Sequence, residues 1–455
     1  MNSVSVFGIG KLGLPLAASL ANKEYRVIGV DLNQAVVNAV NEHKSPFYEP
    51  GLDRLVKSAG ENLSATVDYG DAVRNTELSF IIVPTPSQPD GSFSTKFVEE
   101  VVDQLAVHLK QKDGFHVVVV TSTVLPGATE GVIKSLLEQG SGKKCARDFG
   151  LCYNPEFIAL GSVIRDFNNP DVVLIGESDS RSGEMLAEVH RRTCDNNPPI
   201  IRTTIQNAEL AKISLNAYVT MKITFANTLA EMAERIPGGD AEVISAMLGH
   251  DTRIGLKYLR GGLPYGGPCF PRDNRAFASV ARKLGCQAKL AVATDDANSG
   301  QVARVVELIE HELGGVRNRD VAMLGLTYKP NTDVVEESAP VKIALNLKER
   351  GARVSVYDPA GMSNARHQLG EEGIRYATSA TDCLKGAEFC ILATPWPEFK
   401  KLTGDDFSLN MRNASLLDCW RMFDRSALSG KVKYAAIGLA PVVVHEPVEQ
   451  GQRRR

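Results

Sequence analysis

The sequence predicts an α/β protein with two Rossmann-like, doubly wound domains joined by a long central helix and a helical dimerisation region. Three observations lead to this fold class. Short β-branched runs alternate with helical segments up to about residue 200, and the same alternation starts again near Asp320. Between the two blocks, apolar residues recur at helical spacing from 205 to 235. A helix of that length typically bridges domains or builds a dimer interface.

We divide the chain into an N-terminal α/β domain (1–204), a central helical domain (205–300), a smaller C-terminal α/β domain (317–440) and a flexible tail (441–455). The strands expected in the first domain are Val4–Gly8, Arg26–Asp31, Leu78–Val83, Val117–Thr121, Gly150–Asn154 and Asp171–Gly176. The elements expected in the C-terminal domain are strands at Val321–Leu324, Arg353–Tyr357, Phe389–Ala393, Ser415–Asp418 and Tyr434–Ile437, with a helix at Pro340–Arg350. We expect the 205–235 helix to end at Pro237-Gly238-Gly239.

Composition excludes several classes of partner. The 455 residues allow two or three full cores, and the 43% hydrophobic and 23% charged content is that of a globular protein. A net charge of −3 gives no electrostatic reason to expect nucleic acid or an anionic membrane. The eight cysteines include no C-x-x-C pair, which argues against structural zinc and disulfides, so we expect no metal. With no signal-like N-terminus, we expect a cytoplasmic protein.

A glycine-rich turn follows the first expected strand and opens a helix. It reads Gly8-Ile9-Gly10-Lys11-Leu12-Gly13, and Asp31 closes the second strand eighteen residues after Gly13. In a strand–turn–helix context this is the dinucleotide fingerprint, since such glycines admit a pyrophosphate at a helix N-terminus. An acid at Asp31 binds ribose hydroxyls and repels a 2′-phosphate, which favours NAD over NADP. The alternative is a turn in which the glycines serve packing alone.

Two hydroxyl-rich turns follow the third and fourth strands. They contain Pro84-Thr85 and Ser122-Thr123. Ligands of open parallel sheets bind beyond the carboxyl ends of strands, so we expect these four residues to line the cofactor cleft. Ser/Thr capping of a following helix is the alternative.

Charged and amide side chains supply further candidates. Glu156, with Phe157, follows another strand and is placed to act as a general base, although a surface loop glutamate explains it equally. Lys212 and Asn216 are spaced i, i+4 on the long helix and therefore share a face. A solvated polar stripe is the alternative for that pair.

The stretch Gly266-Gly267-Pro268-Cys269-Phe270-Pro271-Arg272-Asp273 is the most specific motif. A thiol becomes nucleophilic as thiolate, and nearby positive charge or a helix N-terminus favours that form. Asp273 lies four residues after Cys269, on the same face if a helix starts there. A buried, inert cysteine is the alternative.

Together and in this order, these motifs resemble the UDP-glucose/GDP-mannose dehydrogenase family of nucleotide-sugar 6-dehydrogenases, from Gly8 to about Asp424. Pro46–Leu52 and Leu324–Lys329 support the resemblance. It implies that residues 1–204 bind NAD, that residues 317–440 bind a UDP-sugar, and that the chain oxidises a sugar C6 alcohol to a carboxylate in an NAD-dependent, four-electron reaction, with UDP-glucose as the leading substrate. The long helix separately indicates a homo-oligomer, a dimer or larger.

The resemblance also implies a role for each catalytic candidate. Cys269 matches the nucleophile that forms a thiohemiacetal and then a thioester, and Lys212 matches the lysine that stabilises oxyanions at C6. Asn216 matches the lysine's hydrogen-bonding partner. Asp273 and Thr123 match the pair that positions a catalytic water, and Glu156 matches the base for thioester hydrolysis.

The remaining matches concern the sugar nucleotide. Arg253 matches an arginine that reaches the site from a neighbouring subunit, and Arg421 matches a nucleotide contact from the C-terminal domain. Lys and Arg suit a diphosphate on charge grounds. The residues expected to contact substrate are Glu156, Phe157, Lys212, Asn216, Arg253, Tyr258, Arg260, Tyr265, Gly266, Tyr328, Lys329 and Arg421.

The chain departs from the usual family pattern on the cofactor side. Leu160 and Glu336 replace a glutamate and an arginine, and Val36 replaces a frequent cation. Loss of both members of a charge pair is consistent with compensation, because an unpartnered buried arginine is costly.

Three rival functions stay open at this point. The same chemistry fits UDP-N-acetylhexosamines or GDP-mannose. A two-electron hydroxyacid dehydrogenase shares the fingerprint and the long helix but needs neither Cys269 nor residues 317–440. A non-catalytic sugar-nucleotide-binding protein gives no reason to combine Cys269, Lys212 and Asp273.

Overall fold

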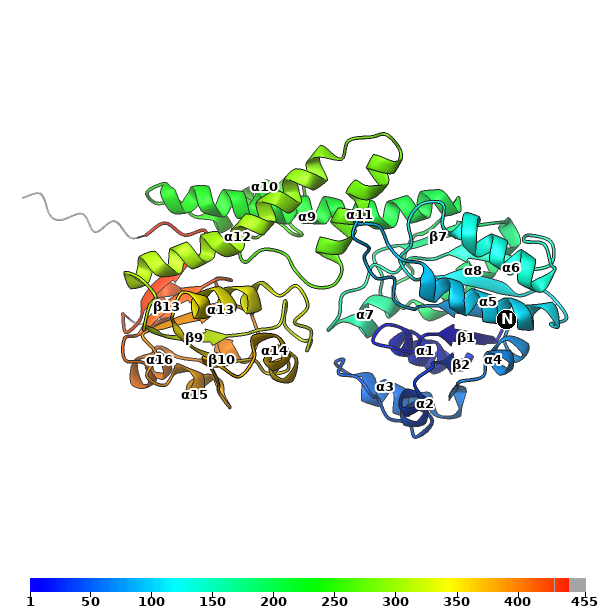
Figure 1. The fold of residues 1–455 in the computed structure, drawn as a ribbon, viewed down its shortest axis with the longest axis horizontal. Coiled ribbons are helices and arrows are strands. Elements are labelled where there is room, and N and C mark those ends of the chain that lie inside the picture. Colours follow the sequence, from blue (N-terminus) through cyan, green and yellow to red (C-terminus); the bar gives the residue numbers. More distant parts are fainter. Residues whose placement is uncertain (429, 442–455) are drawn as a thin grey trace, which may run out of the picture. The chain divides into compact units, whose positions relative to one another are not determined.

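The computed structural model describes residues 1–428 and 430–441. They form two compact units, each built around one sheet (Figure 1). The N-terminal unit comprises Met1–Ala217 and Arg272–Val292, and the C-terminal unit comprises Tyr218–Pro271 and the described chain from Ala293 onward. The expected tail lies outside the described residues, except for Pro441.

The N-terminal unit contains an eight-stranded sheet in the order β3-β2-β1-β4-β5-β6-β7-β8. Its strands are β1 (Ser3–Phe7), β2 (Arg26–Val30), β3 (Leu63–Thr66), β4 (Leu78–Ile81), β5 (Val117–Val120), β6 (Gly150–Tyr153), β7 (Val173–Glu177) and β8 (Ile200–Thr203). Its helices are α1 (Gly13–Asn22), α2 (Gln34–Asn41), α3 (Leu52–Ala59), α4 (Tyr69–Asn75), α5 (Lys96–Lys110), α6 (Lys134–Ser141), α7 (Val163–Asn168) and α8 (Ser180–Thr193), with short 3₁₀ and π turns at Gly60–Asn62 and Thr129–Ile133.

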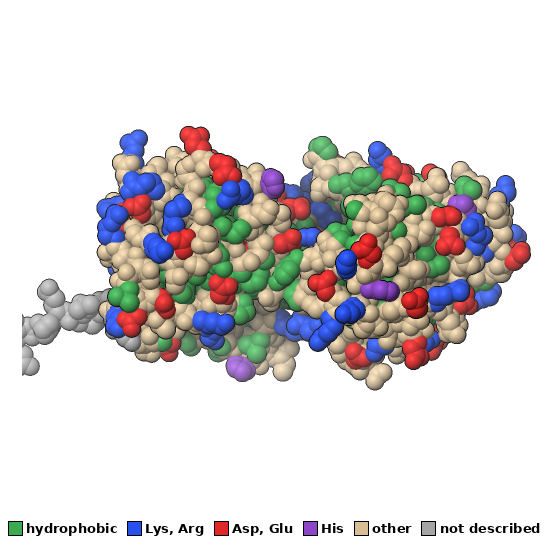
Figure 2. Space-filling view, turned by 90° about the horizontal axis from the view of Figure 1, so that it is seen from below, with side chains coloured by type: hydrophobic (Ala, Val, Ile, Leu, Met, Phe, Trp, Pro, Cys, Tyr) green, Lys and Arg blue, Asp and Glu red, His purple; other side chains and the backbone are tan. Residues whose placement is uncertain are grey.

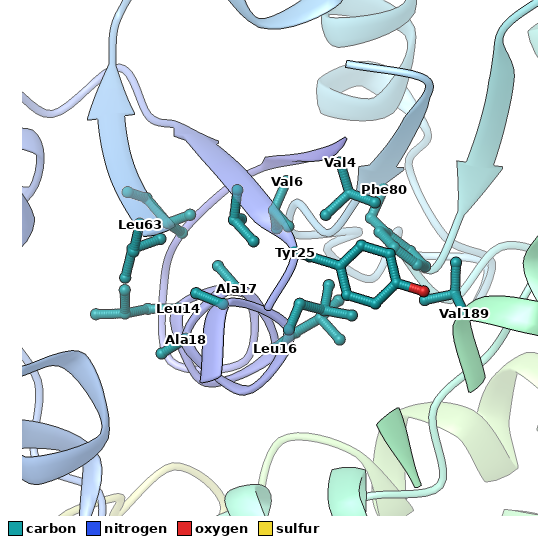
Figure 3. Packing of buried hydrophobic residues seen from close by; sticks show 14 of the residues in the cluster. Val4, Val6, Leu14, Leu16, Ala17, Ala18, Tyr25, Leu63, Phe80 and Val189 are labelled. Carbon is teal, nitrogen blue, oxygen red and sulfur yellow. The ribbon is translucent and has the colours of Figure 1, made fainter. Parts of the chain in front are cut away.

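Apolar residues fill both faces of this sheet. On one face, α1, α2, α3 and α8 pack on the strands, and Figure 3 shows Leu14 and Ala17 of α1 beside Val6 and Leu63. On the other face, buried residues of α4, α5 and α6 cover the sheet. A sheet covered on both faces needs near-continuous apolar strands, as in the all-valine β5.

The C-terminal unit contains a six-stranded parallel sheet in the order β11-β10-β9-β12-β13-β14. Its strands are β9 (Asp320–Leu324), β10 (Arg353–Tyr357), β11 (Ile374–Tyr376), β12 (Phe389–Leu392), β13 (Ser415–Asp418) and β14 (Lys433–Ala436). Helices α13 (Ala339–Glu349) and α14 (Met362–Leu369) cover one face, and α15 (Ala380–Leu384) and α16 (Gly404–Asn410) cover the other (Figure 1). Short 3₁₀ turns lie at Phe399–Lys401 and Arg425–Leu428.

Long helices carry the chain between the two sheets. The 31-residue α9 (Ile205–Arg235) matches the predicted helix, and its residues are shared between the two units. The other central helices are α10 (Ala241–His250), α11 (Phe270–Lys283) and α12 (Lys289–Leu313). No helix in the described part of the chain is long and apolar enough to cross a membrane. Acidic and basic side chains are interspersed on the face drawn in Figure 2, in keeping with the small net charge.

The predicted fold class is confirmed, with two differences in detail. Strands β3, β8 and β11 were missing from the prediction, and all three lie at sheet edges, where a strand is short and pairs on one side only. In addition, β7 runs antiparallel to β6. Apolar composition does not encode strand direction, so the expectation of an all-parallel sheet was wrong there.

Candidate active site

The glycine-rich turn connects β1 to α1. Gly8 has φ +90°, and a Cβ there would lie 2.2 Å from the carbonyl oxygen of Ile82; one on Gly13 would lie 1.9 Å from that of Gly8. Both glycines are therefore required by the protein itself. A Cβ on Gly10 would meet no heavy atom within 4 Å. Gly10 thus leaves open space at a helix N-terminus, which fits the pyrophosphate of NAD.

The other residues of this turn have distinct surroundings. Ile9 is fully buried and packs against Gly29 of β2, whereas Lys11 and Leu12 are half-buried. Asp31 directly follows β2, is half-buried, and accepts a 2.9 Å hydrogen bond at Oδ1 from the Asn33 amide. Its position fits a ribose contact. Val36, in contrast, is buried in the apolar core, so this position does not present a side chain to a ligand.

The two hydroxyl-rich turns are tied to each other. Thr85 Oγ1 donates to the Thr123 carbonyl oxygen at 2.8 Å, and Ser122 Oγ accepts from the Val83 amide at 2.8 Å. The Thr85, Ser122 and Thr123 side chains are buried, whereas Pro84 is exposed. The Ser122 hydroxyl thus stabilises the turn itself, at the carboxyl ends of β4 and β5.

Lys212 and Glu156 form a buried pair. The Lys212 ammonium donates to the Glu156 carbonyl oxygen and lies 3.4 Å from Glu156 Oε2, with the two side chains 6% and 14% exposed. It also lies 5.2 Å from the centre of the Phe157 ring, within cation–π range. The strand-end glutamate and the helix lysine, 56 residues apart, are therefore brought together.

Asn216 and Asp273 form a second buried pair, one helical turn along α9. Asn216 Nδ2 donates to Asp273 Oδ2 at 2.6 Å, and Asp273 is fully buried. The other carboxylate oxygen accepts from Arg272 Nε at 2.9 Å, and the Arg272 guanidinium stacks 4.7 Å from the Phe93 ring centre. A buried carboxylate needs such partners, because isolated charge is costly to bury.

Glu209 is a buried acid next to the candidate site that the sequence reasoning did not single out. Its carboxylate is fully buried and accepts hydrogen bonds from the Gly127 and Thr129 amides at 2.7 and 2.9 Å. Burial raises the pKa of Glu209, and the hydrogen bonds from Thr129 and Gly127 oppose that shift. Glu209 therefore holds the segment after Thr123 against α9, one turn before Lys212. Its spacing of three from Lys212 is the signal that was available in the sequence.

The cysteine loop lies within the C-terminal unit. Asn298 of α12 accepts from the Tyr265 amide at 2.9 Å and donates to the Tyr265 carbonyl oxygen at 3.0 Å. A Cβ on Gly266 would lie 2.1 Å from the Glu337 carbonyl oxygen, and one on Gly267, at φ +76°, would lie 2.5 Å from the Tyr328 ring. Glycine is required at both positions because the loop rests directly on the C-terminal domain.

Cys269 follows this loop and immediately precedes α11. It is exposed, while five of the other cysteines are buried; all eight lie in the described residues and none is in a disulfide. Phe270 packs edge-on between Tyr258 and Tyr265, at centroid distances of 6.3 and 6.4 Å. The chain thus presents one thiol at a helix N-terminus, one turn before Asp273.

The three candidate arginines each contact a carboxylate. Arg421 pairs with both oxygens of Asp240 at 3.0 Å, Arg260 with Glu242 at 2.5 Å, and Arg253 with Asp251 at 2.5 Å. The Asp240 hydrogen bond raises the pKa of Arg421 further. Arg421 and Tyr258 both have positive φ, 50° and 66°, which is uncommon outside glycine and clusters at functional sites.

Tyr328 and Lys329 lie in the loop after β9, with the Lys329 ammonium 5.8 Å from the Tyr328 ring centre. Two of the positions that depart from the family pattern are accessible to solvent: Glu336 is exposed and Leu160 is half-buried.

Comparison with known proteins covers nearly the whole chain. Residues 2–194 match the NAD binding domain of the UDP-glucose/GDP-mannose dehydrogenase family, residues 206–300 its central domain, and residues 322–425 its UDP binding domain. Within the described residues, no group of three or more His, Cys, Asp or Glu is arranged to hold a metal ion.

Individual relatives agree with this assignment. The UDP-glucose 6-dehydrogenase AglM of Haloferax volcanii is 37% identical over 93% of this chain and 97% of its own length. A GDP-mannose 6-dehydrogenase of Pseudomonas putida is 36% identical over 78% of this chain and 80% of its own. The structure of a UDP-glucose dehydrogenase from the archaeon Pyrobaculum islandicum aligns with TM-score 0.88 and 35% identity, covering 97% of this chain and 98% of that one. The chain therefore belongs to the UDP-glucose/GDP-mannose dehydrogenase family and is an NAD-dependent nucleotide-sugar dehydrogenase.

Proposed function

We propose that the chain oxidises C6 of UDP-glucose twice, giving UDP-glucuronate, and that Cys269 carries the sugar between the two oxidations. One observation supports this above all. Lys212 and Asn216 of α9 form polar pairs with Glu156 and Asp273, and Asp273 lies on α11, one turn after the exposed Cys269 thiol. A two-electron dehydrogenase needs no such thiol.

The N-terminal unit supports the first oxidation. The Gly8–Gly13 turn would hold the pyrophosphate of NAD and Asp31 its ribose, and NAD bound there would supply the hydride acceptor for both oxidations. The Lys212 ammonium is placed to stabilise negative charge on the C6 oxygen, and its burial strengthens that interaction because water screens it little. Glu156 and Phe157 hold the ammonium in place.

The second oxidation requires the thiol. An aldehyde has no hydride to give up until a nucleophile makes its carbon tetrahedral. The Cys269 thiolate adds to C6 to form a thiohemiacetal, whose oxidation leaves a thioester on Cys269. Water then releases the carboxylate and restores the thiol. Each sugar consumes one water and reduces two molecules of NAD.

Residues of the N-terminal unit serve the hydrolysis. Asp273 and Thr123 position the water, and Glu156 acts as its base. Asn216 and Arg272 hold the two Asp273 oxygens, so that the carboxylate keeps one orientation.

The C-terminal unit supplies the nucleotide contacts. Tyr328, Lys329, Arg260 and Arg421 offer two features that a uridine diphosphate needs, an aromatic face and cationic groups for phosphate. The UDP-glucose relatives, which match over nearly their full length, favour UDP-glucose over the GDP-mannose that is named for a relative of similar identity but lower coverage.

We further propose a homo-oligomer formed through α9. Tyr218, Phe225 and Met232 recur every seven residues and are 58%, 51% and 55% exposed. Large apolar side chains that recur every seven residues on an exposed helix face are typical of a helix–helix interface. Arg253, whose side chain is 85% exposed and pairs with Asp251, is then the residue that we expect to reach the site of a neighbouring subunit.

A substrate panel tests the proposal. Purified protein is incubated with NAD and UDP-glucose, UDP-N-acetylhexosamines or GDP-mannose, and kcat/KM is compared from NADH production. UDP-glucose should be preferred by at least tenfold. Preference for another sugar nucleotide would show that UDP-glucose is the wrong substrate, but it would leave the proposed double oxidation standing. Cys269→Ser should form no acid, and undiminished acid formation would contradict the thioester route.

A further inference from the structure

The two sheets repeat one local arrangement. After β1, Gly8 has φ +90° and donates its amide hydrogen to the Val30 carbonyl oxygen at 2.8 Å. After β9, Gly325 has φ +96° and donates to the Tyr357 carbonyl oxygen at the same distance. Val30 and Tyr357 are the last residues of β2 and β10, so the residues that follow them, Asp31 and Asp358, occupy equivalent positions.

The two aspartates have opposite surroundings. Asp31 is half-buried, at the position from which an acid binds a ribose. Asp358 is 1% exposed. Its carboxylate accepts six hydrogen bonds within its own domain: from the Leu326 and Thr327 amides (2.7 and 3.0 Å), Thr327 Oγ1 (3.1 Å), Trp396 Nε1 (3.0 Å) and the Ala360 and Gly361 amides (2.9 and 2.7 Å).

The Leu326 and Thr327 amides belong to the loop that takes a phosphate in a dinucleotide fold. In this domain a side-chain anion already occupies them. The loop also lacks the glycines of the first domain, since Thr327 and Pro330 stand where Gly10 and Gly13 would be. Correspondingly, α13 begins only at Ala339, whereas α1 begins at Gly13.

We propose that Asp358 is an internal anion that fills the phosphate position of the second nucleotide fold and thereby decides which nucleotide that fold accepts. A dinucleotide phosphate is excluded from the loop. The loop is instead locked in the conformation that presents Tyr328 and Lys329 to the uridine diphosphate. Asp358 is a positioning residue, and this role rests on the proposed function.

The contacts that hold this loop also reach the cysteine loop. Thr327, held by Asp358, also accepts from Thr394 Oγ1 through its carbonyl oxygen at 2.6 Å. The adjacent Tyr328 ring forms the surface on which Gly267 rests, two residues before Cys269. A change in the Asp358 contacts is therefore transmitted to both the nucleotide contacts and the loop of the nucleophile.

Calorimetric titration of the full chain with UDP and with NAD tests the proposal. Asp358→Asn keeps the size of the side chain but replaces one acceptor oxygen with a donor that faces amide hydrogens. Its Kd for UDP should rise at least tenfold, while its Kd for NAD stays within twofold. Asp320→Asn is the matched control, because Asp320 lies at the other end of β9 and pairs with Arg353 at the surface. It should leave both constants unchanged.

The outcomes separate the two proposals. Absence of UDP binding and sugar-nucleotide oxidation in the wild type would overturn the proposed function, and with it the ligand named here. A wild type that binds UDP while Asp358→Asn binds it equally well would overturn the role of Asp358 alone. So would a second NAD site per wild-type chain, or parallel weakening of UDP and NAD.

Two further variants cover the case in which Asp358→Asn does not fold. Thr327→Val removes one of the six donors and should weaken UDP binding severalfold with NAD binding unchanged; unchanged UDP binding would count against the proposal. In Asp358→Ala, sodium formate should restore UDP affinity, because formate can take the place of the missing carboxylate at these amides. Sodium chloride at equal ionic strength should not. Equal effects of the two salts would show that the anion has no specific role.

Discussion

Glu209 offers a quantitative test of how the N-terminal unit holds its catalytic residues. Glu209→Ala removes the acceptor for two buried amides, those of Gly127 and Thr129. A hydrogen bond to a charged group contributes about 1.5–3 kcal/mol, so the two together contribute roughly 3–6 kcal/mol. Relief of the carboxylate's own burial cost, the main cause of its raised pKa, offsets part of this. We expect a net loss of about 3 kcal/mol in the local stability of the segment.

Hydrogen–deuterium exchange measured by mass spectrometry reports that local stability. A loss of about 3 kcal/mol corresponds to roughly a hundredfold faster exchange in peptides that cover residues 121–133. Because this segment contains Thr123 and packs one turn from Lys212, we also expect kcat to fall at least tenfold while the KM for NAD changes little.

Glu130→Ala is the matched control for Glu209→Ala. Glu130 accepts from Gln206 and so joins the same two elements, but at the exposed surface. Exposed contacts of this kind are worth little, so exchange and kcat should stay near wild type. Exchange in Glu209→Ala less than threefold faster than in Glu130→Ala would refute the reasoning.

Three further predictions follow from other features. Gly10→Ala should leave the melting temperature unchanged but raise the Kd for NAD at least tenfold, whereas Gly13→Ala should destabilise the fold itself, because only its Cβ meets protein atoms; thermal melts and titration distinguish them. Burial lowers the pKa of His116 to about 3 and that of His190 to about 4, so the native state stays unprotonated while the unfolded state takes up protons below about pH 6.5. Stability should therefore fall with pH below that value, by about 2 kcal/mol per histidine at pH 5, and urea unfolding of His190→Gln should show a correspondingly smaller fall. Phe225→Glu should dissociate the oligomer in light scattering, and an unchanged mass would contradict the α9 interface.

Much of the fold was predictable because buried strands and helices differ in periodicity. The valine run of β5 and the apolar stripe of α9 are unambiguous in the sequence. Edge strands such as β8, with the sequence Ile-Ile-Arg-Thr, carry a weak signal since one side of the strand meets solvent. The direction of a strand, such as the antiparallel β7, depends on the path of the connection that precedes it. That path leaves no periodic pattern in the sequence.

The candidate site was predictable residue by residue but not contact by contact. Spacing placed Lys212 and Asn216 on one helical face, and both are buried there. Their partners Glu156 and Asp273 lie 56 and 57 residues away, and only the tertiary fold determines such pairs. Asp358 shows the same limit, because the sequence marks it as a strand-end acid like Asp31 while packing gives it the opposite role.

The ratio of NADH formed to UDP-glucose consumed tests the central claim most directly. Limiting UDP-glucose is oxidised to completion with excess NAD, and NADH is counted by absorbance against the sugar nucleotide consumed. Double oxidation through Cys269 predicts a ratio of two, with UDP-glucuronate as the only sugar product. A ratio of one, with the aldehyde as product, would contradict it.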